Sequence, residues 1–361
     1  MVRRRTTVVL LLLFLFAIGV FSVRQPISYL LKQGVFQGEL LWGRVPLQEA
    51  IDSGRFTDEQ VRKLQLVPEI KSFGEKIGLS ATQNYDSINP SWSRTIYNVS
   101  AAESLAFVNR RWWFPIVGSM PYLGFFQKKP ADDLAVQLEK EGFDVYIRTA
   151  GAYSTLGWFR DPLTPNMLKW REYSLANTIL HELAHATVWV RGSVQFNESF
   201  ANFVGDMAAR QYMIEKYGDA SPEVEKMRQR IEDSARWRNF MHGIYRDLDT
   251  IYSSERPDSE KQREKHRVFS SLVQRVESEG FEDPARWKRA IEKGTWNNAR
   301  MMQYRTYNRS RHWFQLLYEQ QDEDLLKFMD AISSLTADAS NPYRALAEAV
   351  GENYDAKDTV R

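Results

Sequence analysis

The 361-residue chain contains no cysteine. It therefore forms no disulfide bond, and it has no thiolate that could act as a nucleophile, bind a metal or carry a lipid. Neither sign of charge dominates, because 48 lysine and arginine residues stand against 46 aspartate and glutamate residues. This balance gives the protein no overall field that favours nucleic acid, and we predict no nucleic-acid partner. Any metal site must use histidine and carboxylate ligands.

Long hydrophobic runs are scarce, and the prominent one is Val8–Val23, directly after Arg3-Arg4-Arg5. A basic flank before a block of Leu, Val and Phe is typical of an export signal. The run lies near the lower limit of the about 17 to 25 apolar residues that cross a bilayer. We favour a signal anchor over residues 1–24, in the inner membrane, with the remaining chain in the periplasm or outside. A signal peptide cleaved at Ala17-Ile18-Gly19 is the alternative, and it also exports the chain.

Apolar residues make up 43% of the chain and aromatic residues 13%, enough for a large core in one large domain or two smaller ones. Apolar spacings of three and four predict helices over about 27–78. Between 83 and 148 the sequence predicts strands, with one helix between the last two. Gly118-Ser119-Met120-Pro121 is interpreted as a turn. We expect an α+β fold, mostly helical, with a small mixed sheet packed against the helices.

The second half of the chain is predicted to be helical throughout. Residues 173–217 indicate two helices that are broken near Arg191-Gly192, with Asn197 as the N-cap of the second. Charged segments on both sides of a Ser-Ser-Glu-Arg-Pro turn predict an antiparallel helical hairpin around 220–280. The simplest interpretation of its charge is exposure to solvent, and a partner-binding arm is the alternative.

Two of the five histidines lie four residues apart in His181-Glu182-Leu183-Ala184-His185. On a helix, positions i and i+4 share a face, so both imidazoles can reach one cation. Glu182 is placed to hold a metal-bound water and to take its proton as general base. Apolar flanking residues indicate a largely buried helix. We predict one Zn²⁺ ion, because zinc accepts nitrogen and oxygen ligands and keeps a position open for catalysis.

A catalytic zinc usually has three protein ligands, and Glu198 is the natural third. It lies in the first turn of the next predicted helix, and the break near Arg191-Gly192 lets that helix fold back beside the first. An isolated histidine on an apolar face is more often an ordinary core residue. The five-residue pattern followed by Asn197-Glu198 is rare by chance, so we favour the metal site. The remaining histidines lack comparable partners and are interpreted as surface or packing residues: His242, His266 and His312.

The motif HELAH followed by NESFA resembles the glutamate-zincin metallopeptidases. The spacing is shorter than in the thermolysin and leukotriene-hydrolase-like branches. A narrower resemblance accounts for the spacing, because AYSTLGWFRDPLTPNML, HELAHATVWV, FNESFANFVG and NNARMMQYRTY together are similar to the bacterial predicted aminopeptidase family. That family is exported and often carried as lipoproteins, whereas this chain has no cysteine for a lipid. The resemblance runs from about Ile27 to about Ala331. We expect a zincin-like metallopeptidase domain over 25–361, with the helical hairpin as an insertion around 220–280.

Carried over by position, the resemblance implies His181, His185 and Glu198 as zinc ligands and Glu182 as the base. It implies a zinc-dependent peptide hydrolase, an aminopeptidase acting on short peptides with free amino termini. The alternative is a membrane-anchored scaffold or binding protein with a non-catalytic zincin fold. An intact Glu182 favours the enzyme, because a structural site needs no carboxylate beside an open coordination position.

Two further assignments concern the substrate. Hydrolysis needs a donor to the oxyanion, and Tyr307 is our first choice, with Tyr304 second. The segment 150–159 is interpreted as one wall of the substrate cleft, with Trp158 and Phe159 lining a hydrophobic subsite. An ordinary turn and strand is the alternative for that segment. The oligomeric state has no signal in the sequence.

Overall fold

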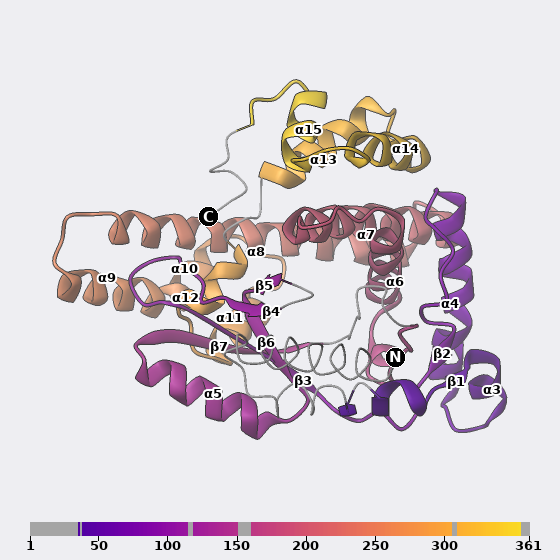
Figure 1. Cartoon of the computed structure of the whole chain (residues 1–361), viewed down its shortest axis with the longest axis horizontal. Helices are drawn as coiled ribbons and strands as arrows, with labels where there is room; N and C mark the ends of the chain where they lie inside the picture. The colour runs from indigo at the N-terminus through magenta and orange to yellow at the C-terminus, as the bar shows by residue number, and fades with distance from the viewer. Residues whose placement is uncertain (1–34, 37, 115–117, 151–159, 305–308, 355–361) are drawn as a thin grey trace, which may run out of the picture.

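The computed structural model describes residues 35–36, 38–114, 118–150, 160–304 and 309–354. Most of these residues are helical and the strands form small antiparallel sheets, which confirms the predicted α+β, mostly helical fold class (Figure 1). The strands are β1 (Val45–Pro46), β2 (Ser87–Ile88), β3 (Ile96–Glu103), β4 (Trp112–Phe114), β5 (Gly118–Met120), β6 (Tyr122–Phe125) and β7 (Phe143–Ala150). The helices are α3 (Leu47–Asp52), α4 (Asp58–Lys76), α5 (Lys128–Lys140), α6 (Glu172–Thr187), α7 (Val194–Tyr217), α8 (Pro222–Tyr252), α9 (Asp258–Ser270), α10 (Leu272–Ser278), α11 (Pro284–Glu292), α12 (Asn298–Met301), α13 (Arg309–Gln320), α14 (Leu325–Thr336) and α15 (Pro342–Ala349), with 3₁₀ turns η1 (Met167–Lys169) and η2 (Met302–Tyr304).

The three-stranded sheet has the order β6-β3-β7, and both pairings are antiparallel. The predicted mixed sheet is therefore wrong. Helix α5 does connect two strands that run in the same direction, β6 and β7, but β3 lies between them and pairs with both. Helix α5 covers one face of this sheet, where its Ala131 and Leu138 pack against Val99 and Leu123 (Figure 1).

Residues 118–120 form strand β5 rather than the predicted turn. They pair with β4 in antiparallel register, with Trp112 opposite Met120. Arg111 holds this hairpin together, because its guanidinium donates to the Ser119 hydroxyl and to the Ser119 carbonyl oxygen, each at 2.8 Å. Pairing with β4, together with the bonds from Arg111 just before that strand, holds residues 118–120 in an extended conformation.

The main core surrounds α6 and α7, which make the most extensive helix contact among the described elements. Helix α4 packs on α6, and α13 packs on α7. Gly205 of α7 sits directly on the backbone of α6, since a Cβ atom built there would lie 2.8 Å from the Asn177 carbonyl oxygen and 3.0 Å from His181 Cβ. The absence of a side chain at Gly205 therefore allows the two helices to approach so closely.

The break between α6 and α7 is present as predicted, but the cap of α7 is Ser193 rather than Asn197. Asn197 lies inside α7 and is fully buried. Its side-chain amide bonds to both backbone groups of Val190: it accepts from the N–H and donates to the carbonyl oxygen, each at 2.9 Å. The connecting loop can therefore bury these two groups, and Asn197 closes the turn that precedes Glu198.

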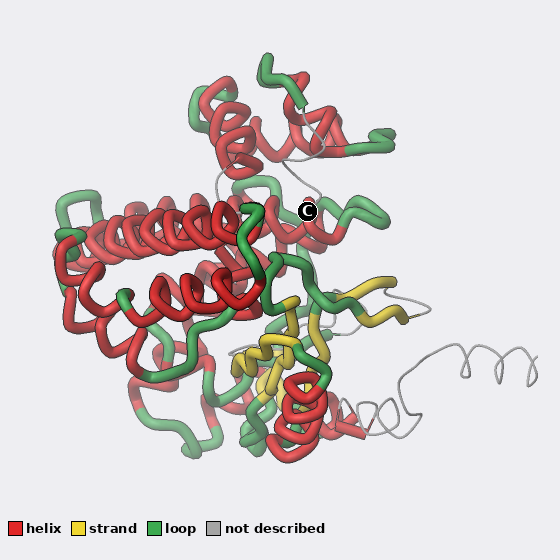
Figure 2. Tube along the Cα trace, turned by 90° about the vertical axis from the view of Figure 1, so that its left-hand side faces the viewer, coloured by secondary structure: helices red, strands yellow, loops and turns green. Residues whose placement is uncertain are grey.

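The predicted helical hairpin is present as α8 and α9, which pack against each other across the loop 253–257. With α10, α11 and α12 they enclose a second, aromatic core in which Trp237 stacks on Trp287 with ring centroids 4.5 Å apart. Figure 2 shows the strands gathered in one part of the chain, with helices around them. Within the described ranges no helix is long and apolar enough to span a bilayer, and the predicted anchor over 1–24 lies outside them. The predicted domain limits stay predictions.

Candidate metal centre

Helix α6 presents the two histidines of the H-E-x-x-H motif on one face. The rings of His181 and His185 lie with centroids 4.7 Å apart and nearly perpendicular, at 89°. The opposite side of α6 is buried by Leu180 and Leu183, which fixes the rotation of the helix. The side chain of His185 is 4% exposed and that of His181 is 16% exposed, so both imidazoles are held by the surrounding protein.

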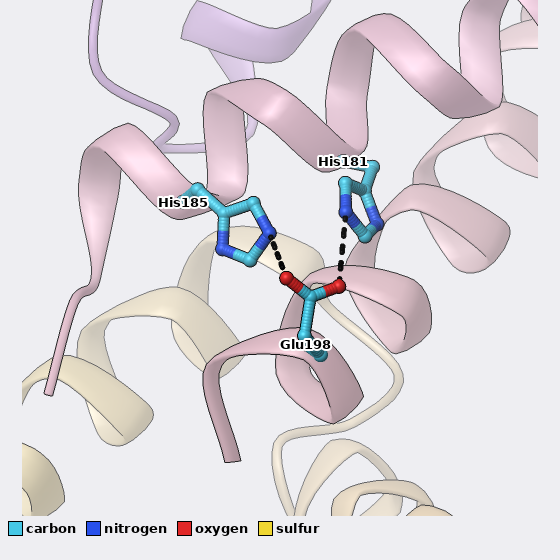
Figure 3. Close-up of side chains that lie close together, drawn as sticks. All are labelled: His181, His185 and Glu198. Carbon is cyan, nitrogen blue, oxygen red and sulfur yellow. Dashed lines mark ion pairs between the residues drawn. The ribbon is translucent and has the colours of Figure 1, made fainter. Parts of the chain in front are cut away.

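Helix α7 brings Glu198 to the same place from the other side of the loop. Its carboxylate faces both rings, with one oxygen 3.5 Å from His185 Nε2 and the other 3.8 Å from His181 Nε2 (Figure 3). One ligand atom from each of these three residues lies within 4.8 Å of the others. The Glu198 side chain is 44% exposed, so solvent reaches the group from that side.

The donor set fits a tetrahedral metal ion. Metal–ligand lengths of about 2.0 to 2.1 Å place neighbouring ligand atoms of a tetrahedron roughly 3.3 Å apart, and the observed 3.5 and 3.8 Å are close to that separation. Two imidazole nitrogens and one carboxylate oxygen are a common catalytic zinc set, with the fourth position open. One departure is His185 Nδ1, which is buried without a hydrogen-bond partner among the described residues. Ligating histidines usually donate from that second nitrogen.

Electrostatics keep the group in the form that binds metal. Burial, together with the neighbouring His185, lowers the pKa of His181 to about 4, so this imidazole is neutral at physiological pH. Burial alone would raise the pKa of Glu198. The hydrogen bond and charge of His185, with the charges of His181 and Arg148, outweigh burial and hold that pKa below its usual value. Glu198 is therefore an anion that faces the neutral imidazole of His181.

Glu182 lies on the turn between the two histidines and is half-buried. Its charge reaches Tyr85, whose pKa is raised well above its ordinary value by burial first and then by Glu182 and Asp161. The Tyr85 hydroxyl is buried and has no hydrogen-bond partner within the described part of the chain. The carboxylate of Glu182 thus lies close to the metal ligands in sequence and close to a protonated phenol in space.

The family described as "Putative aminopeptidase" matches residues 28–346, which is most of the chain. The chain belongs to this aminopeptidase family. The match contains both histidines, Glu182 and Glu198, together with all of the elements that position them. No curated protein and no solved structure matches the chain.

The sequence analysis placed four other residues at the site of this aminopeptidase-family protein: Tyr307, Tyr304, Trp158 and Phe159. Tyr307 lies outside the described residues, as do Trp158 and Phe159 of the predicted cleft wall. Tyr304, the second choice for the oxyanion donor, belongs to the aromatic core, where its hydroxyl accepts a 3.1 Å hydrogen bond from Trp237 Nε1. His242, which the sequence analysis interpreted as a surface or packing residue, lies against the same tyrosine, with Nδ1 3.2 Å from the Tyr304 carbonyl oxygen.

The sequence interpretation missed two residues of the sheet that lie near Glu198. Burial and the charge of Glu198 raise the pKa of Tyr122, while Arg148 lowers it. Arg148 also acts on Glu198. Arg148 lies on a strand that the sequence predicts, whereas Tyr122 lies on β6, which the sequence analysis did not identify. Trp189 was also missed, and its ring lies 5.5 Å from that of His185 in an edge-on contact.

Proposed function

We propose that this protein is a zinc-dependent peptidase that removes amino-terminal residues from short peptides. The observation that carries the proposal is the convergence of His181, His185 and Glu198 from two helices. Membership of the aminopeptidase family supports a peptidase independently of this geometry. The H-E-x-x-H motif followed by a glutamate supports assignment to the glutamate-zincins, in which these three residues hold the ion.

Each residue of the centre has a distinct task in this proposal. His181 and His185 would hold the ion through Nε2, and Glu198 would hold it through a carboxylate oxygen and lower the net charge of the site. When bound, zinc supplies a Lewis acid that polarises water and the scissile carbonyl. Glu182 accepts the proton of the attacking water and then delivers it to the leaving amine. Because the Glu198 side chain is 44% exposed, a substrate can reach the metal centre from that side.

We also propose that the enzyme acts outside the cytoplasmic membrane, tethered to the inner membrane by residues 1–24. The support is the run of arginines followed by an apolar segment. Export would place the enzyme where short peptides from the envelope or the medium are available.

The test is metal content and peptide cleavage of the purified full-length chain. We expect about one zinc per chain by elemental analysis, and cleavage of peptides with free amino termini but not of their N-acetylated forms. His181→Ala and Glu198→Ala should lose the metal. Glu182→Gln should keep it and lower turnover by at least a hundredfold, because general base catalysis contributes about 10² to 10⁴.

His266→Ala is the matched control, since this exposed histidine lies on α9, away from the three ligands. Its metal content and turnover should equal those of the wild type. Absence of zinc from the wild-type chain after loading would refute the metal centre. Zinc binding without cleavage of any peptide would refute the peptidase and favour the non-catalytic scaffold.

A further inference from the structure

Trp189 lies beside the candidate metal centre and is open to solvent. Its ring centroid is 5.5 Å from that of His185, and the two ring planes are inclined at 68°. The side chain of His185 is buried, whereas Trp189 is 42% exposed. A tryptophan side chain carries up to about 250 Å² of surface, so roughly 100 Å² of Trp189 is in contact with water. This apolar surface is available to a ligand at the metal centre.

Trp189 projects outward because its two neighbours in sequence are held in the core. Helix α6 ends at Thr187, and Val188 has an extended backbone, with φ −128° and ψ 117°. Side chains alternate in direction along an extended segment. Val188 is buried in the main core and Val190 packs against the same core. The side chain between them therefore points to the opposite side, away from that core.

Hydrogen bonds fix the backbone on both sides of Trp189. The Val188 N–H donates to the Ala184 carbonyl oxygen at 2.9 Å. The N–H and the carbonyl oxygen of Val190 both bond to the side-chain amide of Asn197, each at 2.9 Å. The exposed ring is therefore carried by a short, anchored stretch of chain, and little backbone entropy is lost when a ligand contacts it.

The same bonds connect Trp189 to the third metal ligand. Asn197 directly precedes Glu198, and Val190, which Asn197 holds, directly follows Trp189. The Glu198 carboxylate faces the His185 ring at 3.5 Å and its side chain is 44% exposed (Figure 3). Two separate sets of contacts, one through the ring of His185 and one through Asn197, thus place Trp189 next to the metal ligands.

We propose that Trp189 forms one wall of a subsite for an apolar side chain next to the scissile bond. This inference rests on the proposed peptidase function and names its substrates: short peptides with a large aliphatic or aromatic residue beside the bond that is cleaved. The Cα atoms on the two sides of a peptide bond lie about 3.8 Å apart. When that bond is held at the metal centre, both flanking side chains begin close to the ligands, and a leucine or phenylalanine side chain can reach the indole. An aromatic side chain would gain a ring contact in addition to the apolar area that it buries.

The subsite differs in its consequences from a purely structural role of Trp189. If the indole served only to cover the His185 ring, its loss would weaken zinc binding and would affect all peptides alike. A subsite wall instead sets the preference among peptides while the zinc content stays constant. The decisive quantity is therefore a ratio of peptide affinities, measured on protein that holds zinc.

Binding to the zinc-loaded Glu182→Gln protein tests the inference without turnover. Calorimetry would compare Gly-Gly-Gly with Phe-Gly-Gly and Gly-Phe-Gly, which place one phenyl ring before or after the first peptide bond. We expect at least one phenylalanine peptide to bind about tenfold more tightly than Gly-Gly-Gly, the lower end of what an apolar pocket contributes. The tighter of the two identifies the side of the bond that Trp189 receives. Adding Trp189→Ala should remove the preference, and Trp189→Phe should keep part of it, because a smaller ring remains beside His185.

Trp42→Ala is the matched control, because it removes the same side chain from an 88% exposed position in the segment before β1. It should leave the preference unchanged. Equal binding of the three peptides, or a preference that survives Trp189→Ala, would overturn the inference. If Trp189→Ala does not hold zinc, the comparison passes to zinc-loaded Trp189→Phe, and an undiminished preference there would overturn the inference as well. Failure of the proposed function looks different, because the wild type would then cleave none of the peptides while the zinc-loaded protein still showed the preference.

Discussion

Replacing Gly205 by alanine should separate the two helices that build the metal centre. The added Cβ would lie 2.8 Å from the Asn177 carbonyl oxygen, 3.0 Å from His181 Cβ and 3.3 Å from His181 Cα. These atoms belong to the backbone or are bonded to it, so no rotamer change can move them away. Unstrained carbon atoms lie about 3.5 to 4.0 Å apart, and the helices must therefore move by roughly 0.5 Å.

The expected loss of stability follows from two opposing contributions. Overpacking a core costs about 1 to 3 kcal/mol, and replacing glycine by alanine in a helix returns about 0.5 to 1 kcal/mol. The net decrease in the free energy of unfolding, measured by urea denaturation, is then roughly 0 to 2.5 kcal/mol. Because the Glu198 oxygens already lie 3.5 and 3.8 Å from the histidine nitrogens, further separation should weaken zinc affinity about tenfold, the lower end of what supporting residues contribute.

Gly243→Ala provides the matched control. Gly243 lies inside α8, and a Cβ built there meets nothing within 4 Å. This substitution should raise the free energy of unfolding by about 0.5 to 1 kcal/mol and leave zinc affinity unchanged. If Gly205→Ala also gained stability and bound zinc as tightly as wild type in a chelator competition, the close contact of α6 with α7 would not control the site.

Three further outcomes are expected. Asn197→Ala removes both hydrogen bonds to Val190 and should lower the free energy of unfolding by about 1 to 3 kcal/mol, with faster hydrogen exchange at the Val190 amide; unchanged exchange there would contradict the role of Asn197. Asp206 accepts hydrogen bonds from Tyr173, Arg210 and Arg311. Burial alone would raise the pKa of Asp206, but the charges of the two arginines and the hydrogen bond from Tyr173 hold that pKa below the ordinary value of 3.8. The stabilisation that ionised Asp206 contributes is therefore fully present above pH 3.8 and is lost as the pH falls through the lower pKa of the folded protein. In urea titrations, the free energy of unfolding of Asp206→Asn should fall less than that of wild type between about pH 5 and pH 2. Equal losses would show that Asp206 is not the group responsible. Binding of Co²⁺ should quench the fluorescence of Trp189, whose ring lies 5.5 Å from His185, and the quenching should be smaller in Trp189→Phe; identical quenching in the two proteins would place the ion elsewhere.

Several features were predictable because they depend on residues close together in sequence. The spacing of His181 and His185 specifies one helical face once the segment is helical, and the structure places both rings there. The break between α6 and α7 was also predictable from the local sequence, and Gly192 adopts a positive φ of 79° within it. The helical hairpin of α8 and α9 follows from its turn and its charged outer face.

The errors arose where hydrogen-bond pairing in the folded chain decides the outcome. The sheet was expected to be mixed, with one helix between its last two strands. In the structure β3 lies between β6 and β7 and pairs with both in antiparallel orientation. Asn197 was expected to cap a helix, as its residue type and position indicate. In the folded chain its amide bonds to Val190 instead, because burying the loop leaves two backbone groups that need partners.

The sequence alone determined the chemistry that the protein can offer: no thiol, two imidazoles at helical spacing, a carboxylate between them, and another soon after. Helix geometry is local, so these relationships follow from spacing without knowledge of the fold. Tertiary structure alone decided that Glu198 faces both imidazoles and that Arg148 and Tyr122 lie near it. Those approaches depend on how closely α6 and α7 pack at Gly205 and on which sheet face α5 covers, and packing of distant segments is not encoded in the spacing of any one of them.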